Sequence, residues 1–545
     1  MRKKYVIITI GVLVVILGIA MFLFGVSMFT YQGPPISNWV NNAGKYSFIL
    51  FLPTISVGIT LLISGVRIKK AAALALLLFI CTLLKAQEHS MSKTYVTPTD
   101  TLVQQKLHKW QDLKFGLFMH WGPYSEWGVV ESWSLCPEDE GWTQRKAEHG
   151  ATYNEYKKNY ENLYTTFNPT GFKPENWVKA AKNAGMKYVV FTTKHHDGFS
   201  MFDTKQTDYK ITNTKDPFSS NPRSNVTKEI FNAFSKENFM IGAYFSKPDW
   251  HSENYWWPYF PPKDRNVNYD PAKYPERWQK FKDFTYNQIG ELMSDYGKVD
   301  ILWLDGGWVR PKSSMDSASP DYKKAYDQDI DMPKIAAMAR KKQPGLIVVD
   351  RTVTGEYENY TTPEQQVPNT PLDHPWESCI TMGNSWSYVP GDHYKSTNQI
   401  VSLLVKIVSR GGNLLMNIGP GPDGDWDPVA YSRLEQIGQW IKVNGEGIYG
   451  SVAVAPYSEG NIFYTKSKNS NTIYAFSLSD NDKVKLPTTI ILHLKDIKKV
   501  KKVSLLGINK KIKFNETADA LTITIPADLQ ENNNLTQTAT FKIQY

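Results

Sequence analysis

Residues 188–199 read YVVFTTKHHDGF, and this stretch shows how the chain is built. An apolar and β-branched run, as long as one buried strand, stops at the polar sequence KHHDG. Residues 301–308, ILWLDGGW, repeat the pattern, because an apolar run there ends in Asp305. Short apolar runs of this kind are typical of parallel strands buried on both faces. The polar residues behind them mark the strand ends at which side chains are free to bind ligands.

The pattern recurs between residues 105 and 448, where apolar runs alternate with stretches of helical periodicity. The expected strands are 114–121, 188–193, 240–245, 300–305, 346–351 and 413–418, with a weaker one near 376–380. Apolar residues recur at helical spacing between them, as in Ile400, Leu403, Leu404, Ile407 and Val408. These βα units predict an α/β fold, a (β/α)8-like catalytic barrel of the TIM type. A doubly wound open sheet is the alternative, but no Gly-rich phosphate loop follows the first strand.

Residues 449–545 have a different sequence pattern, in which short strand-like runs follow one another without helices. The expected strands are 471–479, 488–494, 503–507, 521–526 and 540–544. In LTITI, residues 521–525, apolar and hydroxyl residues alternate as a half-buried strand requires. We therefore expect a C-terminal antiparallel β-sandwich whose default role is packing.

Apolar segments occupy most of the first 87 residues. Residues 5–29 and 46–66 are long enough to cross a bilayer, so residues 1–66 predict two transmembrane helices. Residues 67–87 have a basic front, a shorter apolar run and a small residue, Ala86, which is the layout of a signal peptide. Basic clusters precede the first span and follow the second, and the positive-inside rule places both clusters in the cytoplasm. The remaining chain is then expected on the periplasmic or secreted side.

Two explanations of this N-terminus stay open. The chain is either a genuine membrane-tethered protein or a membrane hairpin joined to a complete secreted protein by a misplaced start. We favour the second, because a signal peptide needs no two spans ahead of it.

Composition narrows the class of function. The 545 residues, 41% of them hydrophobic, suffice for more than one folded unit. The formal charge of +9 includes a Lys-rich stretch at 498–513, which we interpret as a solvated face, because no nucleic-acid recognition motif accompanies it. Cys136 and Cys379 lack zinc-ligand spacing and either pair or remain free thiols. His195 and His196 have no third ligand at matching spacing, so the sequence predicts no metal site.

The place of a polar residue along its strand separates structural from functional groups. Active sites of parallel barrels lie at the carboxyl ends of the strands. Asp300 begins the fourth strand and Asp305 ends it, so we expect Asp300 to be structural and Asp305 to belong to the site. Arg351 ends the fifth strand and is expected to contact the ligand or to hold a carboxylate.

From about residue 107 onward, the chain resembles the α-L-fucosidases of glycoside hydrolase family 29. The family's motifs occur in order as KFGLFMHWG (114–122), KHHDGF (194–199), WLDG (303–306) and NIGP (417–420). The resemblance places the catalytic nucleophile on Asp305. It implies that fucose is bound by His120, His195, His196, Tyr244 and Trp303. The family's Glu-Trp pair after the first strand corresponds to Glu131 and Trp133, which Ser132 separates here.

The second catalytic carboxyl rests on a weaker part of the resemblance. The sequence TPE at 362–364 is similar to the acid/base region of one branch of the family. Glu364 is therefore the first choice for the acid/base and Glu377, beside Trp376, the second. Glu356 and Glu358 are expected on the loop surface.

The implied function is hydrolysis of terminal α-L-fucose from glycans with retention of configuration. Asp305 would form a covalent fucosyl-enzyme intermediate, and Glu364 would act first as acid and then as base. The reaction requires no metal and no other cofactor. The expected partners are fucosylated glycans or oligosaccharides, and a membrane if the N-terminal segments are retained, but no nucleic acid. The alternatives are a non-catalytic sugar-binding barrel and another retaining exo-glycosidase.

Overall fold

The structure is a computed structural model that describes residues 2–29, a few positions between 47 and 59, and most of the chain from residue 95. Residues 138–144, 495–498, 518 and 531–535 are left out of that last part. The chain divides into two compact units, Met1–Lys93 and Thr94–Tyr545.

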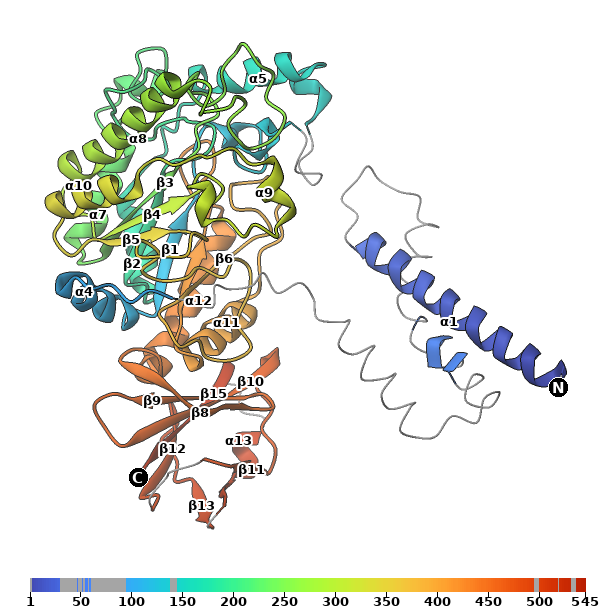
Figure 1. Cartoon of the computed structure of the whole chain (residues 1–545). Helices are drawn as coiled ribbons and strands as arrows, with labels where there is room; N and C mark the ends of the chain where they lie inside the picture. Colours follow the sequence, from blue (N-terminus) through green and yellow to red (C-terminus); the bar gives the residue numbers. More distant parts are fainter. Residues whose placement is uncertain are drawn as a thin grey trace. The chain divides into compact units, whose positions relative to one another are not determined.

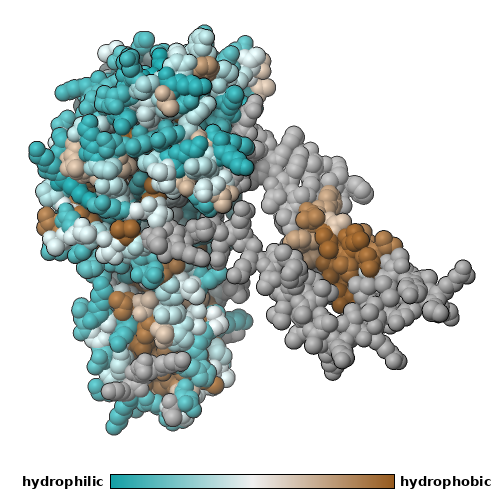
Figure 2. All heavy atoms as spheres, viewed as in Figure 1, coloured by the Kyte–Doolittle hydropathy of each residue, from teal (hydrophilic) through white to brown (hydrophobic). Residues whose placement is uncertain are grey.

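The first unit contains one long helix, α1 (Arg2–Phe29), which coincides with the first predicted membrane span. Figure 2 shows hydrophobic surface on it, contributed by Leu13, Ile16, Leu17 and Leu23. Over the residues that the structure describes, no helix combines the length and the apolarity that a bilayer span requires. The second predicted span, 46–66, lies mostly outside the described residues, and the signal-like segment, 67–87, lies wholly outside them.

The second unit begins with the predicted barrel sheet (Figure 1), in which seven parallel strands of the described residues run in the order β5-β4-β3-β2-β1-β7-β6. The strands are β1 (Phe115–Met119), β2 (Tyr188–Lys194), β3 (Met240–Ser246), β4 (Ile301–Asp305), β5 (Ile347–Asp350), β6 (Glu377–Thr381) and β7 (Asn413–Asn417). All seven predicted strands are thereby confirmed.

Helices precede β1, follow β7 and lie between most of the successive strands, and they flank the sheet (Figure 1). They are α4 (Thr101–Gln111), α5 (Tyr153–Glu161), α6 (Pro174–Asn183), α7 (Val226–Lys236), α8 (Pro275–Asp295), α9 (Pro320–Lys324), α10 (Met332–Lys342), α11 (Thr397–Ser409) and α12 (Pro428–Asn444). The predicted apolar stripe at 400–408 lies on α11, which a capping box at Ser396 begins.

Alternation along each strand separates the barrel interior from the helix-facing core. In β4, Leu302 and Leu304 belong to the large core shared with the helices, whereas Trp303 belongs to a second cluster that fills the interior. Successive strand residues point to opposite faces, so Asp305 continues the row of Trp303. The last residue of this row therefore lies at the mouth of the barrel.

Strands β5 and β6 are the two edges of the sheet, and an irregular segment lies between them. Isolated bridges join Val349 of β5 to Glu358, and Glu364 to Cys379 of β6. The segment is not a regular strand, because Pro363 has no N–H to donate and Gln365 has a φ of +53°. The barrel is thus closed by non-strand backbone, and Glu364 lies on it.

The C-terminal part consists of two antiparallel sheets, which confirms the predicted sandwich class. One sheet has the order β12-β15-β10-β9-β8 and the other β11-β14-β13. The elements are β8 (Ser451–Glu459), β9 (Ile462–Ser467), β10 (Thr472–Lys483), β11 (Thr489–Leu492), β12 (Lys502–Leu505), β13 (Lys513–Glu516), β14 (Leu521–Thr524), α13 (Ala527–Gln530) and β15 (Thr536–Gln544). Trp440 of α12 donates to Thr538 of β15 at 2.8 Å and so links the sandwich to the barrel.

Three strands of this sandwich, β8, β9 and β13, were not predicted. Most side chains of β8 and β13 are exposed or half-buried, so neither has the alternating apolar pattern of a half-buried strand. Pro456 also interrupts β8. The predicted boundary between residues 448 and 449 stays a prediction, because barrel and sandwich form one compact unit.

Candidate active site

The interior rows of neighbouring strands end in polar residues that meet at the carboxyl end of the barrel. Ser246 of β3 is in register with Asp305 of β4. Arg351 follows β5, and His120 follows β1, whose neighbour β7 ends in Asn417. Because these ends adjoin one another in the sheet, residues far apart in sequence meet at one end of the barrel.

Asp305 is the one residue of β4 that is not fully buried, and its side chain is 14% exposed. Its Oδ1 accepts hydrogen bonds from the Gly306 N–H at 2.7 Å and from Arg351 Nη1 at 3.0 Å. Its Oδ2 accepts from the Tyr244 hydroxyl at 2.8 Å. Burial by itself would raise the pKa of Asp305, but the Arg351 charge and the neighbouring donors hold that pKa well below its usual value. The carboxyl is therefore an anion that a ligand can reach.

Arg351 joins Asp305 to the first-choice acid/base residue. Its Nη1 donates to Asp305 and its Nη2 donates to Glu364. Burial opposes the charge of the guanidinium, but the carboxylates of Glu364 and Asp305 raise the pKa of Arg351 well above its ordinary value. The Glu364 side chain is 39% exposed, so solvent and ligands reach it as well.

The hydrogen bonds of two histidines fix where their protons lie. His120 Nδ1 lies 2.8 Å from Asn417 Oδ1, and the Asn417 amide group donates to the Trp386 carbonyl. His196 Nδ1 lies 2.8 Å from Ser246 Oγ, whose single proton is donated to the Pro248 carbonyl. Each partner oxygen must therefore accept from Nδ1–H, which leaves Nε2 of both rings as a bare acceptor when the rings are neutral.

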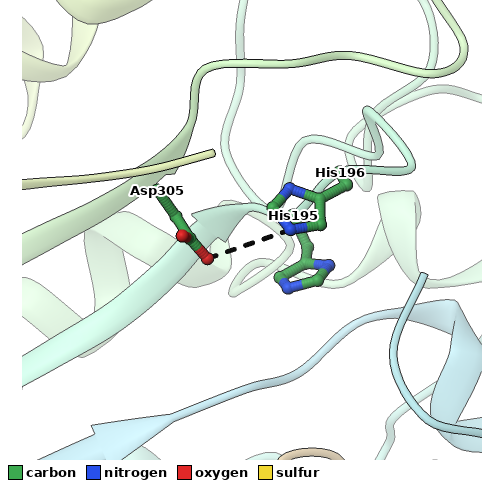
Figure 3. A group of neighbouring side chains, drawn as sticks. All are labelled: His195, His196 and Asp305. Carbon is green, nitrogen blue, oxygen red and sulfur yellow. Dashed lines mark ion pairs between the residues drawn. The ribbon is translucent and has the colours of Figure 1, made fainter. Parts of the chain in front are cut away.

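Burial keeps these rings neutral. It lowers the pKa of His120 to about 4 and the pKa of His196 to about 4. Burial also holds the pKa of His195 well below its ordinary value, and the Ser132 hydroxyl contacts its Nδ1. Figure 3 shows His195 and His196 side by side at the end of β2, with Asp305 facing them from β4.

Glu131 and Trp133 both reach the site from the loop after β1. Glu131 is fully buried, and its Oε1 accepts from the Ser387 N–H at 2.7 Å, whereas its Oε2 has no hydrogen-bond partner in the described part of the chain. Burial, together with the negative charge of Glu364, raises the pKa of Glu131 to about 8. The Trp133 ring meets the His196 ring edge-on at 5.1 Å. Glu131 is thus a neutral acid at pH 7 and a potential hydrogen-bond donor.

Tyr244 and Trp303 belong to the cluster that fills the barrel interior, and Glu377 contacts Trp303. The Tyr244 and Trp303 rings stack at 5.3 Å. Glu377 begins β6 and accepts from the Tyr188 hydroxyl at 2.5 Å and from Trp303 Nε1 at 3.4 Å. Its carboxyl is fully buried at the amino end of β6, whereas Asp305 lies at the carboxyl end of β4. This position argues against Glu377 as the acid/base.

Two other carboxyls are located away from the rim. Asp300 at the start of β4 binds Lys106 at 3.1 Å and Lys298 at 3.0 Å, which is a structural role. Glu356 is exposed as expected, but Glu358 is not on the surface: it is buried and accepts from the Thr352 N–H at 2.9 Å. The irregular backbone that closes the barrel draws Glu358 inward.

Sequence reasoning missed four residues of the site. Ser132, Ser246 and Asn417 orient the three histidines, and the Trp386 ring lies 5.1 Å from the His120 ring. Ser246 and Asn417 occupy interior positions at strand ends, so the alternation along β3 and β7 contains a signal for them. Ser132 and Trp386 come from loops, where no periodicity exists to reveal them.

One group of side chains has the composition of a metal site. One ligand atom each of His195, His196 and Asp305 lies within 4.8 Å of the others. Asp305 comes from β4, far along the chain from the histidine pair. Spacing in the sequence therefore could not identify it as a third ligand.

Comparisons with known proteins identify the family. Residues 82–446 match the family described as Alpha-L-fucosidase, and residues 456–544 match the Alpha-L-fucosidase C-terminal domain. The chain therefore belongs to the α-L-fucosidases, which are glycoside hydrolases.

Relatives and solved structures agree with this assignment. The tissue α-L-fucosidase of Rattus norvegicus is 28% identical, over 84% of this chain and 94% of its own length. The plasma α-L-fucosidase of Homo sapiens is 28% identical, over 76% of this chain and 85% of its own length. α-L-Fucosidase isoenzyme 1 from Paenibacillus thiaminolyticus superimposes with a TM-score of 0.64 at 28% identity, covering 82% of this chain and 99% of that one.

Proposed function

We propose that the chain hydrolyses terminal α-L-fucosides with retention, with Asp305 as nucleophile and Glu364 as acid/base. The observation that supports this most directly is the shared guanidinium of Arg351, which bonds both carboxyls at the mouth of the barrel. Retaining glycosidases need two carboxyls about 5–5.5 Å apart. One planar guanidinium that bonds both carboxyls brings them close to each other.

Asp305 Oδ2 is the atom we expect to attack the anomeric carbon. Oδ1 already accepts two hydrogen bonds, from Gly306 and Arg351, whereas Oδ2 accepts only that of Tyr244 among the described residues. In the first step, Oδ2 bonds to the anomeric carbon as the glycosidic bond breaks and Glu364 protonates the leaving oxygen. In the second step, Glu364 takes a proton from water, which displaces Asp305 and releases fucose.

Glu364 must leave Arg351 before it acts as an acid. A carboxyl that carries a proton is no longer an ion-pair partner, so the contact between Glu364 and Arg351 has to open as substrate binds. The exposure of Glu364, 39% of its side chain, leaves room for that movement toward a bound sugar. Arg351 would then bind Asp305 alone.

Recognition of the sugar fits a pocket of mixed donors and acceptors. The bare Nε2 atoms of His120 and His196 are suited to accept from sugar hydroxyls, and neutral Glu131 is suited to donate. The aromatic walls are suited to apolar sugar faces. The substrate-binding residues we propose are His120, Glu131, Trp133, His195, His196, Tyr244, Trp303 and Arg351, with Trp386 added from the structure.

Azide rescue tests both catalytic assignments in one experiment. Asp305→Ala should lose roughly a thousandfold or more of its activity on an aryl α-L-fucoside. Added azide should restore turnover and yield the β-fucosyl azide, because azide attacks the substrate directly. Glu364→Ala should instead yield the α-fucosyl azide, because azide intercepts the fucosyl-enzyme.

The two alternative functions would give different results. Glu356→Ala, an exposed carboxylate of the same segment, is the matched control and should keep full activity. Firm fucose binding without turnover by the wild type would favour a non-catalytic sugar-binding barrel. Turnover of aryl β-galactosides but not of fucosides would favour another exo-glycosidase.

We further propose that the enzyme acts on the periplasmic or secreted side of a membrane. The signal-like layout of residues 67–87 and the similarity to a plasma α-L-fucosidase support this location. N-terminal sequencing of the native protein separates the two forms of the proposal. A start near Gln87 would indicate a processed enzyme, whereas a start at Met1 would indicate one anchored through residues 1–66.

A further inference from the structure

Two acceptor atoms face each other in the pocket without a hydrogen between them. His196 Nε2 lies 3.9 Å from Asp305 Oδ2. Ser246 Oγ accepts a hydrogen bond from Nδ1–H of His196, so the Nε2 atom presents a lone pair to the carboxylate. Lone pairs of a neutral imidazole and a carboxylate repel each other unless a donor or a cation lies between them.

A ring nitrogen of His195 completes the group. Figure 3 shows the two histidines, which follow β2, beside Asp305, and one ligand atom of each of the three residues lies within 4.8 Å of the others. Two imidazoles and one carboxylate form a ligand set that Zn²⁺ and other first-row transition metals accept. Nδ1 of each ring already has a partner, Ser132 or Ser246, which is the outer-shell support that metal-binding histidines normally have.

We propose that the pocket binds Zn²⁺ through His195, His196 and Asp305, and that the bound ion inhibits the enzyme by occupying the place of the sugar. The ion removes Asp305 Oδ2, the expected attacking atom, from the reaction. It also takes the Nε2 of His196 that we assign to a sugar hydroxyl. Zn²⁺ and fucose therefore exclude each other.

The neighbouring charge limits how tightly the ion binds. Arg351 donates to Asp305 Oδ1 at 3.0 Å, so a second positive charge lies close to the proposed ion. The two cations use different oxygens of the same carboxylate, so both can be present. Their mutual repulsion lowers the affinity for Zn²⁺. Reversible inhibition is therefore expected, not a permanently bound metal.

Steady-state kinetics of the full-length protein give the first test. ZnCl₂ should raise the apparent KM for an aryl α-L-fucoside by about tenfold or more, while kcat stays unchanged. A tenfold change corresponds to about 1.4 kcal/mol of apparent binding free energy. EDTA should reverse the effect. Inhibition that lowers kcat and leaves KM unchanged would overturn the proposal, because such an ion would bind outside the sugar site.

Direct binding gives a second test that needs no catalysis. Calorimetric titration of ZnCl₂ into the wild type should show one site, and excess L-fucose should abolish it. Zinc binding that fucose leaves unaffected would contradict the proposal. Because this titration does not depend on turnover, it stays decisive even if the enzyme proves inactive on fucosides.

Variants locate the ion. His196→Gln should lose the zinc isotherm, and circular dichroism checks that the variant is folded. His493→Gln and His251→Gln are matched controls, since these histidines also pair with glutamates, at 2.7 Å with Glu459 and at 3.0 Å with Glu161. Both controls should keep the isotherm and the inhibition. Loss of zinc inhibition in either control would place the ion at that pair instead.

Discussion

Asp305 ends a strand of the barrel sheet and Glu364 lies on the segment that fills the gap in that sheet, yet one guanidinium bonds both carboxylates. Asp305 ends β4, whereas Glu364 lies on the irregular segment between β5 and β6. Arg351 follows β5, between the two, and donates one Nη to each. Before substrate binds, the two catalytic carboxyls are therefore held together by a side chain as well as by the backbone.

Replacing Arg351 by lysine tests this dependence. A lysine ammonium is a point charge that cannot span two carboxylates as the planar guanidinium does. Arg351→Lys should lower kcat/KM by roughly a hundredfold, the cost of a misplacement of about 1 Å at a reacting group. Arg340→Lys is the control, because Arg340 donates to Asn359 at 3.2 Å on the same segment but makes no contact with either carboxylate among the described residues. Equal kinetics of Arg351→Lys and the wild type would contradict this role.

Tyr244 is predicted to contribute to the position of the acid limb of the pH profile. Its hydroxyl donates to Asp305 Oδ2 at 2.8 Å and helps to hold the pKa of Asp305 below its ordinary value. Tyr244→Phe removes that donor, so the pKa of Asp305 rises and the acid limb of kcat/KM moves to higher pH. The rate at the optimum should fall about tenfold or more, as expected for one hydrogen bond to a charged group.

The control for Tyr244 is another buried tyrosine–aspartate pair. Tyr160 donates to Asp197 at 2.9 Å without contacting Asp305. Tyr160→Phe should leave the acid limb in place. An acid limb that moves equally in both variants would show that general destabilisation, not the bond to Asp305, is responsible.

Alternation along the strands explains how much of the site the sequence could reveal. Asp305 and Arg351 occupy interior positions at carboxyl ends, and position alone separates Asp305 from Asp300 at the other end of β4. The same alternation leads to Ser246 and Asn417. Each strand is specified by about six consecutive residues, so local sequence suffices for it.

The rest of the site depends on contacts between distant segments. Ser132 is 63 residues from His195, and Asn417 is 297 residues from His120. Glu364 reaches the rim only because an irregular segment, which Pro363 prevents from being a strand, fills the gap between β5 and β6. No periodic pattern encodes such a segment, so the acid/base could be chosen only by resemblance.

Glu131 is predicted to make stability depend on pH. Its pKa rises from 4.5 to about 8 on folding, so the neutral form stabilises the folded state below about pH 4.5 and this contribution is lost as pH rises through 8. Glu131→Gln stays neutral at every pH. Relative to this variant, the free energy of unfolding of the wild type should fall by up to about 1.4 kcal/mol per pH unit between about pH 4.5 and 8. Denaturant unfolding at several pH values measures this difference. The exposed Glu253→Gln should parallel the wild type, and a Glu131→Gln curve that also parallels it would count against burial as the cause.

Glu377 is predicted to support the pocket floor instead of transferring protons. Its carboxyl accepts from Tyr188 at 2.5 Å and from Trp303 at 3.4 Å, and Trp303 in turn stacks on Tyr244 beside the nucleophile. Glu377→Ala leaves both donors buried without an acceptor and opens a cavity, so the free energy of unfolding should fall by roughly 2–5 kcal/mol. Glu377→Gln keeps an acceptor oxygen and should keep most of the stability. On aryl fucosides of graded leaving-group pKa, both variants should slow good and poor leaving groups alike, whereas Glu364→Ala should slow poor ones far more. A selective loss on poor leaving groups in Glu377→Gln would return the acid/base role to Glu377.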